Sequence, residues 1–176
     1  MFIENVTEVY VAEEGEVYAL MVTGSQNRSI SATDMNAHSS RSHTCFIVTV
    51  QQSNTKTFSS KTGQLYLVDL AGSERSMKTK AVGKILDEAN MINKSLTNLG
   101  KVINHLTDGK STHIPYRDSK LTRVLQESLG GNAKTSLIIT CSPAKYNLDE
   151  TLSTLRFGAR AKRIKNKPKV NKELTI

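Results

Sequence analysis

The sequence predicts an α/β domain, and three observations support this. Strand-like apolar runs lie at 44–50, 64–69 and 135–140. A long segment with helical apolar spacing separates the last two runs, and strands that alternate with helices are typical of α/β folds. The run at 64–69 ends in an aspartate with a glycine three residues later, so a buried strand is expected to bring an acid and a bare backbone amide to one point.

The N-terminal part is expected to form a strand, a helix and a loop before the first of these runs. The strand is expected near 6–11 and the helix at 13–23, where apolar residues share one face and Gly24 is a stop signal. The polar stretch 25–42 then predicts a loop.

Two helices are expected in the middle of the chain. Apolar residues at 86–106 recur at spacings of three and four, which predicts one long amphipathic helix closed by Asp-Gly at 108–109. A second helix is expected at 119–129, capped by Asp118 or Ser119 and stopped by a pair of glycines.

A last helix is expected from Asn147 to about Ile164, with Asn147 and Glu150 as a capping box. Pro168 prevents its continuation. The tail at 165–176 is therefore expected to be extended, and mobile unless something holds it.

The composition is that of a soluble protein. The formal net charge is +8 and the positive charge lies mainly in the C-terminal half, which favours a polyanionic partner. The apolar runs are far shorter than the roughly 20 residues of a membrane helix and the start lacks a signal peptide pattern, so a cytoplasmic location is expected. Cys45 and Cys141 lie in strand-like runs without metal-ligand spacing, so both are expected to be buried free thiols.

The acid at the end of the strand at 64–69 has two interpretations. Asp69 followed by Gly72 has the form of the acid and amide that lie beside Mg²⁺ and the terminal phosphate in nucleotide hydrolases. Alone, the pair also fits a strand that ends in a turn, with Asp69 bonding local amides. The upstream loop, NAHSSRSH at 36–43, favours the first interpretation, because hydroxyls suit Mg²⁺ and phosphate oxygens and a guanidinium suits carboxylates or phosphates. On its own, that loop also fits a solvated Ser-rich segment.

Together, NAHSSRSH and LVDLAGSE resemble switch I and switch II of the kinesin motor domain. The similarity continues through HIPYRDSKLTR, TSLIITCSP and RFGARAKRIKN and covers essentially the whole chain. It implies a three-layer fold of the phosphate-loop nucleotide hydrolase type, with a mixed central sheet and helices on both faces. The segments that it implies are the C-terminal half of a motor domain at 1–164, switch I at 33–43, switch II at 69–74, a microtubule-binding region at 75–129 and a neck linker at 165–176.

The resemblance also implies roles for single residues in ATP and Mg²⁺ binding. Ser40 would bind Mg²⁺, and Asp69 would contact it through water. Gly72 would offer its backbone amide to the γ-phosphate, while Arg41 and Glu74 would form the ion pair that closes the switches around the attacking water. The full set implied in nucleotide binding or catalysis is Asn36, Ser39, Ser40, Arg41, Asp69, Gly72 and Glu74.

These 176 residues contain no phosphate-binding loop of the form GxxxxGK[ST]. The nearest stretch, GGNAKT at 130–135, follows a predicted helix and precedes a predicted strand, whereas a phosphate loop must follow a strand and open a helix. The kinesin family carries this loop upstream of where the chain begins. The chain is therefore expected to lack the N-terminal half of the motor domain, which would be its partner, and alone neither to bind ATP tightly nor to hydrolyse it.

A basic surface is expected on the long helix and beyond it. Lys94, Asn98, Lys101 and His105 recur at spacings of four, three and four opposite the apolar stripe. A solvated basic face explains such a pattern equally simply, but the resemblance implies that this region binds the acidic surface of the microtubule. The residues expected to take part are Lys78, Lys80 and Lys84 in the loop before the helix, Lys94 and Lys101 on it, and Tyr116, Arg117, Lys120 and Arg123 after it.

The favoured function is thus part of a microtubule-stimulated ATPase acting on cytoplasmic microtubules. The alternative is a non-catalytic microtubule-binding module, which the absence of a phosphate loop favours for this chain. Myosins share an SSR switch, but SSRSH and DLAGSE fit kinesins better. Zinc spacing and RNA-binding aromatic patterns are absent, so nucleic acid binding is not expected. Coiled-coil heptads are also absent, so the homodimer expected of the parent protein would depend on a coiled coil outside these residues.

Overall fold

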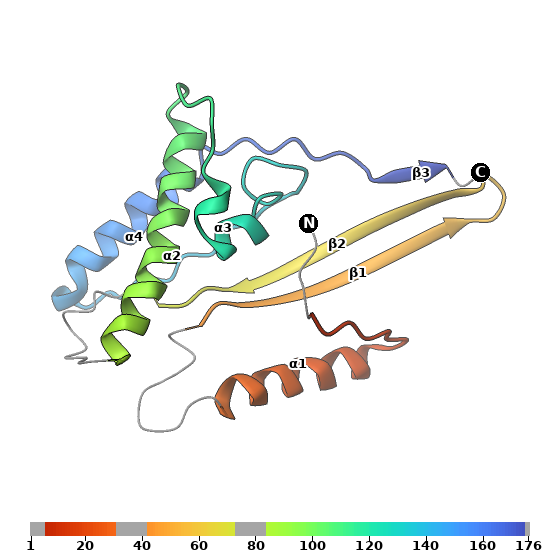
Figure 1. The fold of residues 1–176 in the computed structure, drawn as a ribbon, viewed down its shortest axis with the longest axis horizontal. Coiled ribbons are helices and arrows are strands. Elements are labelled where there is room, and N and C mark those ends of the chain that lie inside the picture. Colours follow the sequence, from red (N-terminus) through yellow and green to blue (C-terminus); the bar gives the residue numbers. More distant parts are fainter. Residues whose placement is uncertain (1–5, 31–41, 73–83, 175–176) are drawn as a thin grey trace. The chain divides into compact units, whose positions relative to one another are not determined.

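The computed structural model describes residues 6–30, 42–72 and 84–174 (Figure 1). Its internal contacts divide the chain into two units. The first unit contains the residues up to 49 together with 64–72, and the second unit contains the remainder. Within the described ranges, the helices are too short or too polar to cross a membrane.

Helix α1 (Glu14–Ile30) is longer than the sequence predicts. The predicted stop at Gly24 is wrong, because a glycine ends a helix by adopting a positive φ, and among the described glycines only Gly109 and Gly130 do so. Acidic residues in the first turn and Arg28 in the last turn complement the helix dipole. The helix therefore carries Arg28 through a stretch that was expected to be a loop.

Strands β1 (Thr44–Asn54) and β2 (Ser59–Asp69) form a hairpin and extend further than predicted. The side chain of Asn54 shapes the turn between them, because its Oδ1 accepts hydrogen bonds from the backbone N–H groups of Lys56 at 2.9 Å and Thr57 at 3.0 Å. The opposite ends of the two strands lie in the first unit, where they carry the polar residues described below.

Two predicted strands, near 6–11 and at 135–140, are not formed. A strand needs a hydrogen-bonded neighbour, and neither stretch pairs with another strand among the described residues. Their apolar side chains are instead exposed, with Tyr10 at 104% and Ile138 at 88% of full exposure. Both stretches do contain the apolar residues that predicted strands, but the rest of the described chain does not bury these side chains.

The sheet of the described residues has three strands in the order β1-β2-β3. Strand β3 (Lys172–Leu174) pairs antiparallel with the start of β2, with Ser59 opposite Leu174. The tail is extended, as predicted, but its end is paired rather than free (Figure 1). The expected mixed central sheet is not assembled by the described residues, because the stretch at 135–140 makes no ladder.

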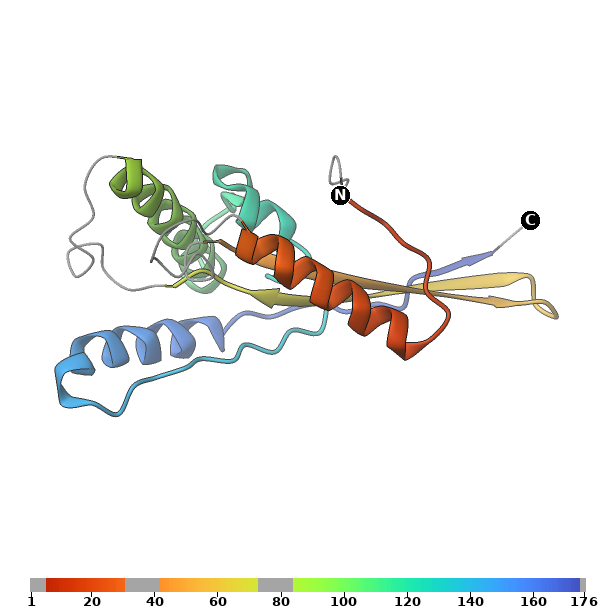
Figure 2. The same cartoon turned by 90° about the horizontal axis from the view of Figure 1, so that it is seen from below.

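Helix α2 (Lys84–Thr107) confirms the long amphipathic helix and forms the centre of the second unit. It contacts both α3 (Lys120–Val124) and α4 (Leu148–Ala161) (Figures 1 and 2). Val102 and Ile103 of α2 are fully buried. The buried apolar residues of this unit are Leu99, Val102, Ile103, Leu121, Leu125 and Leu129.

The turn that ends α2 is the predicted Asp-Gly turn. Gly109 has a φ of +68°, which favours glycine. Asp108 accepts hydrogen bonds from the hydroxyl of Ser111 and from the backbone N–H groups of Ser111 and Lys110. These bonds, the one from the Ser111 hydroxyl foremost, lower the pKa of Asp108 to about 2. The turn thus sets the direction in which the chain leaves α2.

Helix α3 is capped as predicted but is shorter than expected. The Ser119 Oγ accepts a hydrogen bond from the Thr122 N–H at 3.1 Å, so Ser119 rather than Asp118 is the cap. Helix α3 follows a short 3-10 turn, η3 (Tyr116–Asp118). After α3, turns continue to Gly130, whose φ of +86° suits the predicted glycine stop.

Helix α4 follows a second 3-10 turn, η4 (Lys145–Asn147), and ends before the predicted Ile164. The predicted capping box is wrong, because Asn147 makes no side-chain cap and its Nδ2 donates instead to the Ser142 Oγ at 3.1 Å. The stretch before η4 runs alongside α4 (Figure 2). The Ile139 side chain lies against Gly158, where a Cβ would come within 2.8 Å of the Ile139 Cδ1.

The two cysteines are free, as predicted, but the expectation that they are buried is wrong. Cys45 and Cys141 are both exposed. Cys45 lies at the start of β1 and Cys141 follows the unpaired stretch at 135–140. Strand-like sequence predicts burial only where another layer packs on the strand.

Candidate functional site

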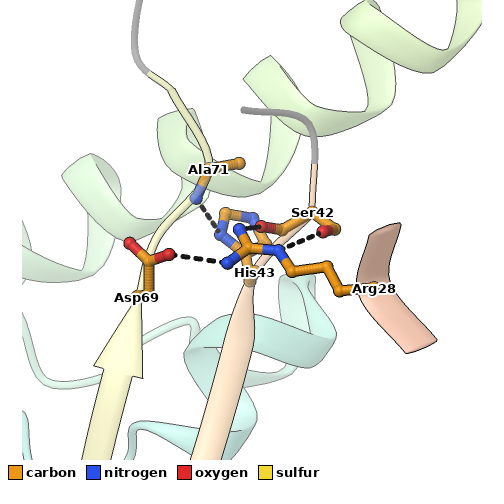
Figure 3. Close-up of polar contacts among 5 residues, drawn as sticks. All are labelled: Arg28, Ser42, His43, Asp69 and Ala71. Carbon is orange, nitrogen blue, oxygen red and sulfur yellow. Dashed lines mark hydrogen bonds and ion pairs between the residues drawn. The ribbon is translucent and has the colours of Figure 1, made fainter. Parts of the chain in front are cut away.

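A polar cluster in the first unit joins the end of α1 to the strand ends of the hairpin (Figure 3). Arg28 Nη1 donates to Asp69 Oδ2 at 2.7 Å and forms an ion pair with it. The Arg28 Nε donates to the Ser42 Oγ at 3.2 Å, and its Nη2 donates to the Ser42 carbonyl oxygen at 2.9 Å. One guanidinium therefore holds both the chain entering β1 and the last residue of β2.

His43 makes a second link between the same two strand ends. Its Nδ1 accepts a hydrogen bond from the backbone N–H of Ala71 at 3.0 Å (Figure 3). Burial, and then the positive charge of Arg28, lower the pKa of His43. The ring that accepts this bond is neutral, with its proton on Nε2. The entry to β1 is thus tied to the residue that lies between Asp69 and Gly72.

The structure brings together the described part of the predicted switch residues. Asp69 ends β2 and Gly72 follows it, while Ser42 and His43 belong to the predicted switch I segment. Ser42, His43 and Asp69 share the cluster around Arg28, and Gly72 directly follows Ala71, whose N–H bonds His43. The other predicted nucleotide-site residues lie outside the described ranges, so their contacts stay predictions; they are Asn36, Ser39, Ser40, Arg41 and Glu74.

Sequence reasoning missed Arg28, because it assigned 25–42 to a loop. The available signal was a basic residue in the last turn of a helix whose first turn is acidic, provided that the helix passed Gly24. The Arg28 side chain is 19% exposed, whereas that of Asp69 is 69% exposed. Asp69 is therefore fixed by a partly buried cation and still faces solvent.

Of the two residues implied in Mg²⁺ binding, the structure describes Asp69. In nucleotide sites this ion keeps several waters and uses one or two carboxylates together with substrate phosphates. Asp69 supplies one exposed carboxylate at a strand end. No group of three or more acidic, histidine or cysteine side chains suited to a metal occurs in the described ranges. In the structure this carboxylate pairs with Arg28, so its contact with such an ion through water stays a prediction.

The basic residues of α2 and α3 lie in the second unit, where one buried contact links their elements. Lys94 and Lys101 are exposed on α2, on either side of Asn98. Asn98 was expected on this exposed face, but it is only 5% exposed and its Nδ2 donates to the Asp118 carbonyl oxygen at 2.9 Å. This bond links the middle of α2 to the end of η3. The exposed basic residues that follow are Arg117, Lys120 and Arg123.

Tyr116 differs from its basic neighbours because it points partly inward. Its hydroxyl donates to the Leu129 carbonyl oxygen at 2.5 Å, and burial, followed by the charge of Glu127, raises its pKa. Its hydroxyl is thus used inside the domain. Lys84 is the first residue of α2 rather than part of the preceding loop. Lys78 and Lys80 lie outside the described ranges.

Comparison with known proteins identifies the class to which these features belong. Residues 1–164 match the family model of the kinesin motor domain, and the chain belongs to this family. Among individual proteins, it is 65% identical over 98% of its length to kinesin-related protein 3 of Dictyostelium discoideum. It is 62% identical over 99% of its length to the kinesin heavy chain of Botryotinia fuckeliana. The family predicted from the two switch sequences is therefore confirmed.

Solved structures show that the chain has the kinesin motor fold. A fast kinesin structure matches 99% of the chain with a TM-score of 0.88 and 61% identity. The structure of a KIF14 dimer with AMP-PNP in complex with a microtubule matches 97% with a TM-score of 0.88 and 43% identity. The chain spans 49% of each solved chain, and 14% and 20% of the two curated relatives.

Proposed function

We propose that this chain is the part of a kinesin motor that senses the γ-phosphate of ATP and binds the microtubule. The observation that carries the proposal is the cluster of Arg28, Ser42, His43, Asp69 and Ala71, from which both predicted switch segments depart. A phosphate bound at this point is within reach of two loops that are anchored side by side, so a single group can order both.

In this function, the protein positions the reactants and stabilises charge, which is most of what phosphoryl transfer requires. The Gly72 amide contacts the γ-phosphate, and Arg41 and Glu74 pair to enclose the attacking water. Bound ATP and Mg²⁺ supply the transferred phosphoryl group and the charge that neutralises it. Ser40 and Asp69 would hold the metal, Asp69 through water. Asn36 and Ser39 act near the phosphate and the attacking water.

The chemistry requires a phosphate-binding loop that these 176 residues do not contain. Its source, in this proposal, is a polypeptide with the N-terminal half of a motor domain. The tail at 165–176 is the neck linker, and its pairing with β2 supports this role. In the parent protein, a coiled coil joins two such motors into a homodimer on cytoplasmic microtubules.

A second candidate function is a microtubule-binding module without catalysis. The observation that favours it is the presence of the exposed basic residues together with the absence of the phosphate loop from the sequence. ATP turnover and microtubule binding therefore need to be measured separately.

The purified chain is expected to bind microtubules without steady ATP turnover, because its switches have no phosphate cradle to close on. The measurement is phosphate release with Mg·ATP, with and without microtubules. When the chain is expressed in one polypeptide with a half that carries GxxxxGK[ST], turnover is expected, and Arg41→Ala should reduce it about 100-fold or more. Turnover by the chain alone that Arg41→Ala abolishes would contradict the proposed division of the site.

Microtubule binding is expected to depend on the exposed basic residues of η3 and α3. Removing three charges with Arg117→Ala, Lys120→Ala and Arg123→Ala should weaken binding about tenfold or more at low salt and flatten its salt dependence. The measurement is co-sedimentation with microtubules over a range of salt concentrations. The matched control removes three exposed charges elsewhere, at Lys56, Lys145 and Arg156. Equal losses in both triple variants would argue against a local binding surface.

A further inference from the structure

Three asparagines of the second unit connect the tail that follows α4 to the rest of that unit, two of them from the tail itself. Asn166 bonds the loop at 128–135, and Asn171 bonds β2 at Thr62. Between them, the Asn132 side chain reaches two tail residues at once. Its Oδ1 accepts the Lys169 N–H at 2.5 Å, and its Nδ2 donates to the Asn171 Oδ1 at 2.8 Å.

Asn132 is itself held in place by Glu127. Its backbone N–H donates to the Glu127 Oε2 at 2.9 Å. The neighbouring Gly131 allows this approach, because a Cβ there would lie 2.7 Å from the Glu127 Cα. The Gly131 carbonyl oxygen accepts the Lys167 N–H at 3.0 Å. Two consecutive loop residues therefore offer the tail fixed groups: the Gly131 carbonyl oxygen bonds Lys167, and the Asn132 carboxamide bonds Lys169.

Asn171, which Asn132 bonds, continues the ladder between β3 and β2. The Asn171 carbonyl oxygen accepts the Thr62 N–H at 3.3 Å, and the Asn171 Nδ2 donates to the Thr62 carbonyl oxygen at 3.2 Å. The next pairs are Lys61 opposite Lys172 and Ser60 opposite Glu173. Thr62 and Asn171 thus continue the same register, and Asn132 fixes one member of that pair.

Strand β3 alone specifies this register weakly. It has three residues, two of them charged, and a short strand with little apolar pattern can slip along its partner. We propose that Asn132 is a positioning residue that selects the register in which the tail docks on β2. The inference rests on the proposed role of the tail as a neck linker. Its partner is the tail of the same chain, and its action needs neither nucleotide nor microtubule.

Disulfide trapping in the full chain tests the register directly. In a Cys45→Ser, Cys141→Ser background, Ser60→Cys is combined either with Glu173→Cys, which is in register, or with Leu174→Cys, which is one residue out. Opposite residues of a ladder lie close enough for a disulfide. With Asn132 present, the in-register bond should form faster under a glutathione buffer. Asn132→Ala should lower the ratio of in-register to out-of-register trapping about fivefold, as expected for the loss of one or two hydrogen bonds.

Two further variants separate positioning from simple loosening of the structure. Asn132→Asp keeps an acceptor for the Lys169 N–H but loses the donor to Asn171, so the ratio should again fall. Asn104→Ala removes an exposed asparagine from α2 and should leave the ratio unchanged. An unchanged ratio in Asn132→Ala, or an equal slowing of both bonds, would overturn the proposal. Because trapping is measured without ATP and microtubules, failure of the motor function leaves this test intact.

Discussion

Ile103→Ala is expected to lower the free energy of unfolding of the second unit by about 3 kcal/mol. The Ile103 side chain is 2% exposed and lies on α2, the helix that contacts both α3 and α4. The truncation removes buried apolar contacts and leaves a cavity, because a packed core relaxes only in part. Urea unfolding followed by far-ultraviolet circular dichroism measures the change as a shift in the midpoint at constant slope.

Ile138→Ala is the matched control, since it removes the same atoms from a side chain that is 88% exposed. Its effect should stay within about 0.5 kcal/mol. Similar losses in the two variants would contradict the assignment of the core to the α2 interface.

Asn166→Ala is expected to cost about 2 kcal/mol of stability, because one carboxamide closes the loop at 128–135. Its Oδ1 accepts the Gly130 N–H at 2.7 Å. Its Nδ2 donates to the Ala133 carbonyl oxygen at 2.8 Å and lies within bonding distance of Ser128 and Thr135. Removal leaves several half-buried polar groups without their partner, which costs more than the net value of one hydrogen bond. Urea unfolding again measures the loss.

Asn166→Asp distinguishes this hydrogen-bond role from a packing role. The carboxylate has nearly the same shape but cannot donate to the carbonyl oxygens that the Nδ2 of Asn166 now faces. It should be at least as destabilising as alanine. Asn104→Ala, on the exposed face of α2, controls for the loss of an asparagine and should have little effect. A harmless Asn166→Asp would show that the carboxamide donor is not needed.

The elements predicted best from the sequence are those with local signals. Helix α2 follows from apolar spacing over many residues, and its end follows from Asp108 and Gly109. The Ser119 cap of α3 was one of two predicted alternatives. Each of these features depends on residues close in sequence, so it can be predicted without knowing which distant residues pack against it.

The elements predicted least well depend on partners distant in sequence. The strands at 6–11 and 135–140 had suitable apolar patterns but no strand to pair with in the described chain. The length of α1 was underestimated because an interior glycine weakens a helix by about 1 kcal/mol without ending it. The pairing of β3 with β2 could not be read from three residues.

The candidate site was predicted in part. The switch sequences placed Asp69 and the segment ending at His43 in one site, and the structure joins their described residues. The role of Arg28 could not be predicted, because its partner Asp69 lies 41 residues further along the chain. A long-range ion pair leaves no local pattern in a single sequence. Whether Arg41 meets Glu74 stays a prediction.

The unpaired stretch before η4 affects how the protein behaves as its concentration rises. Leu137, Ile138 and Ile139 are exposed, carry no charge and lie on backbone that makes no ladder with the described chain. Two copies that meet there could pair their main chains and cover the same side chains, so we expect self-association to increase with concentration. The unfolding free energies of variants should therefore be compared in dilute solution and at the same protein concentration.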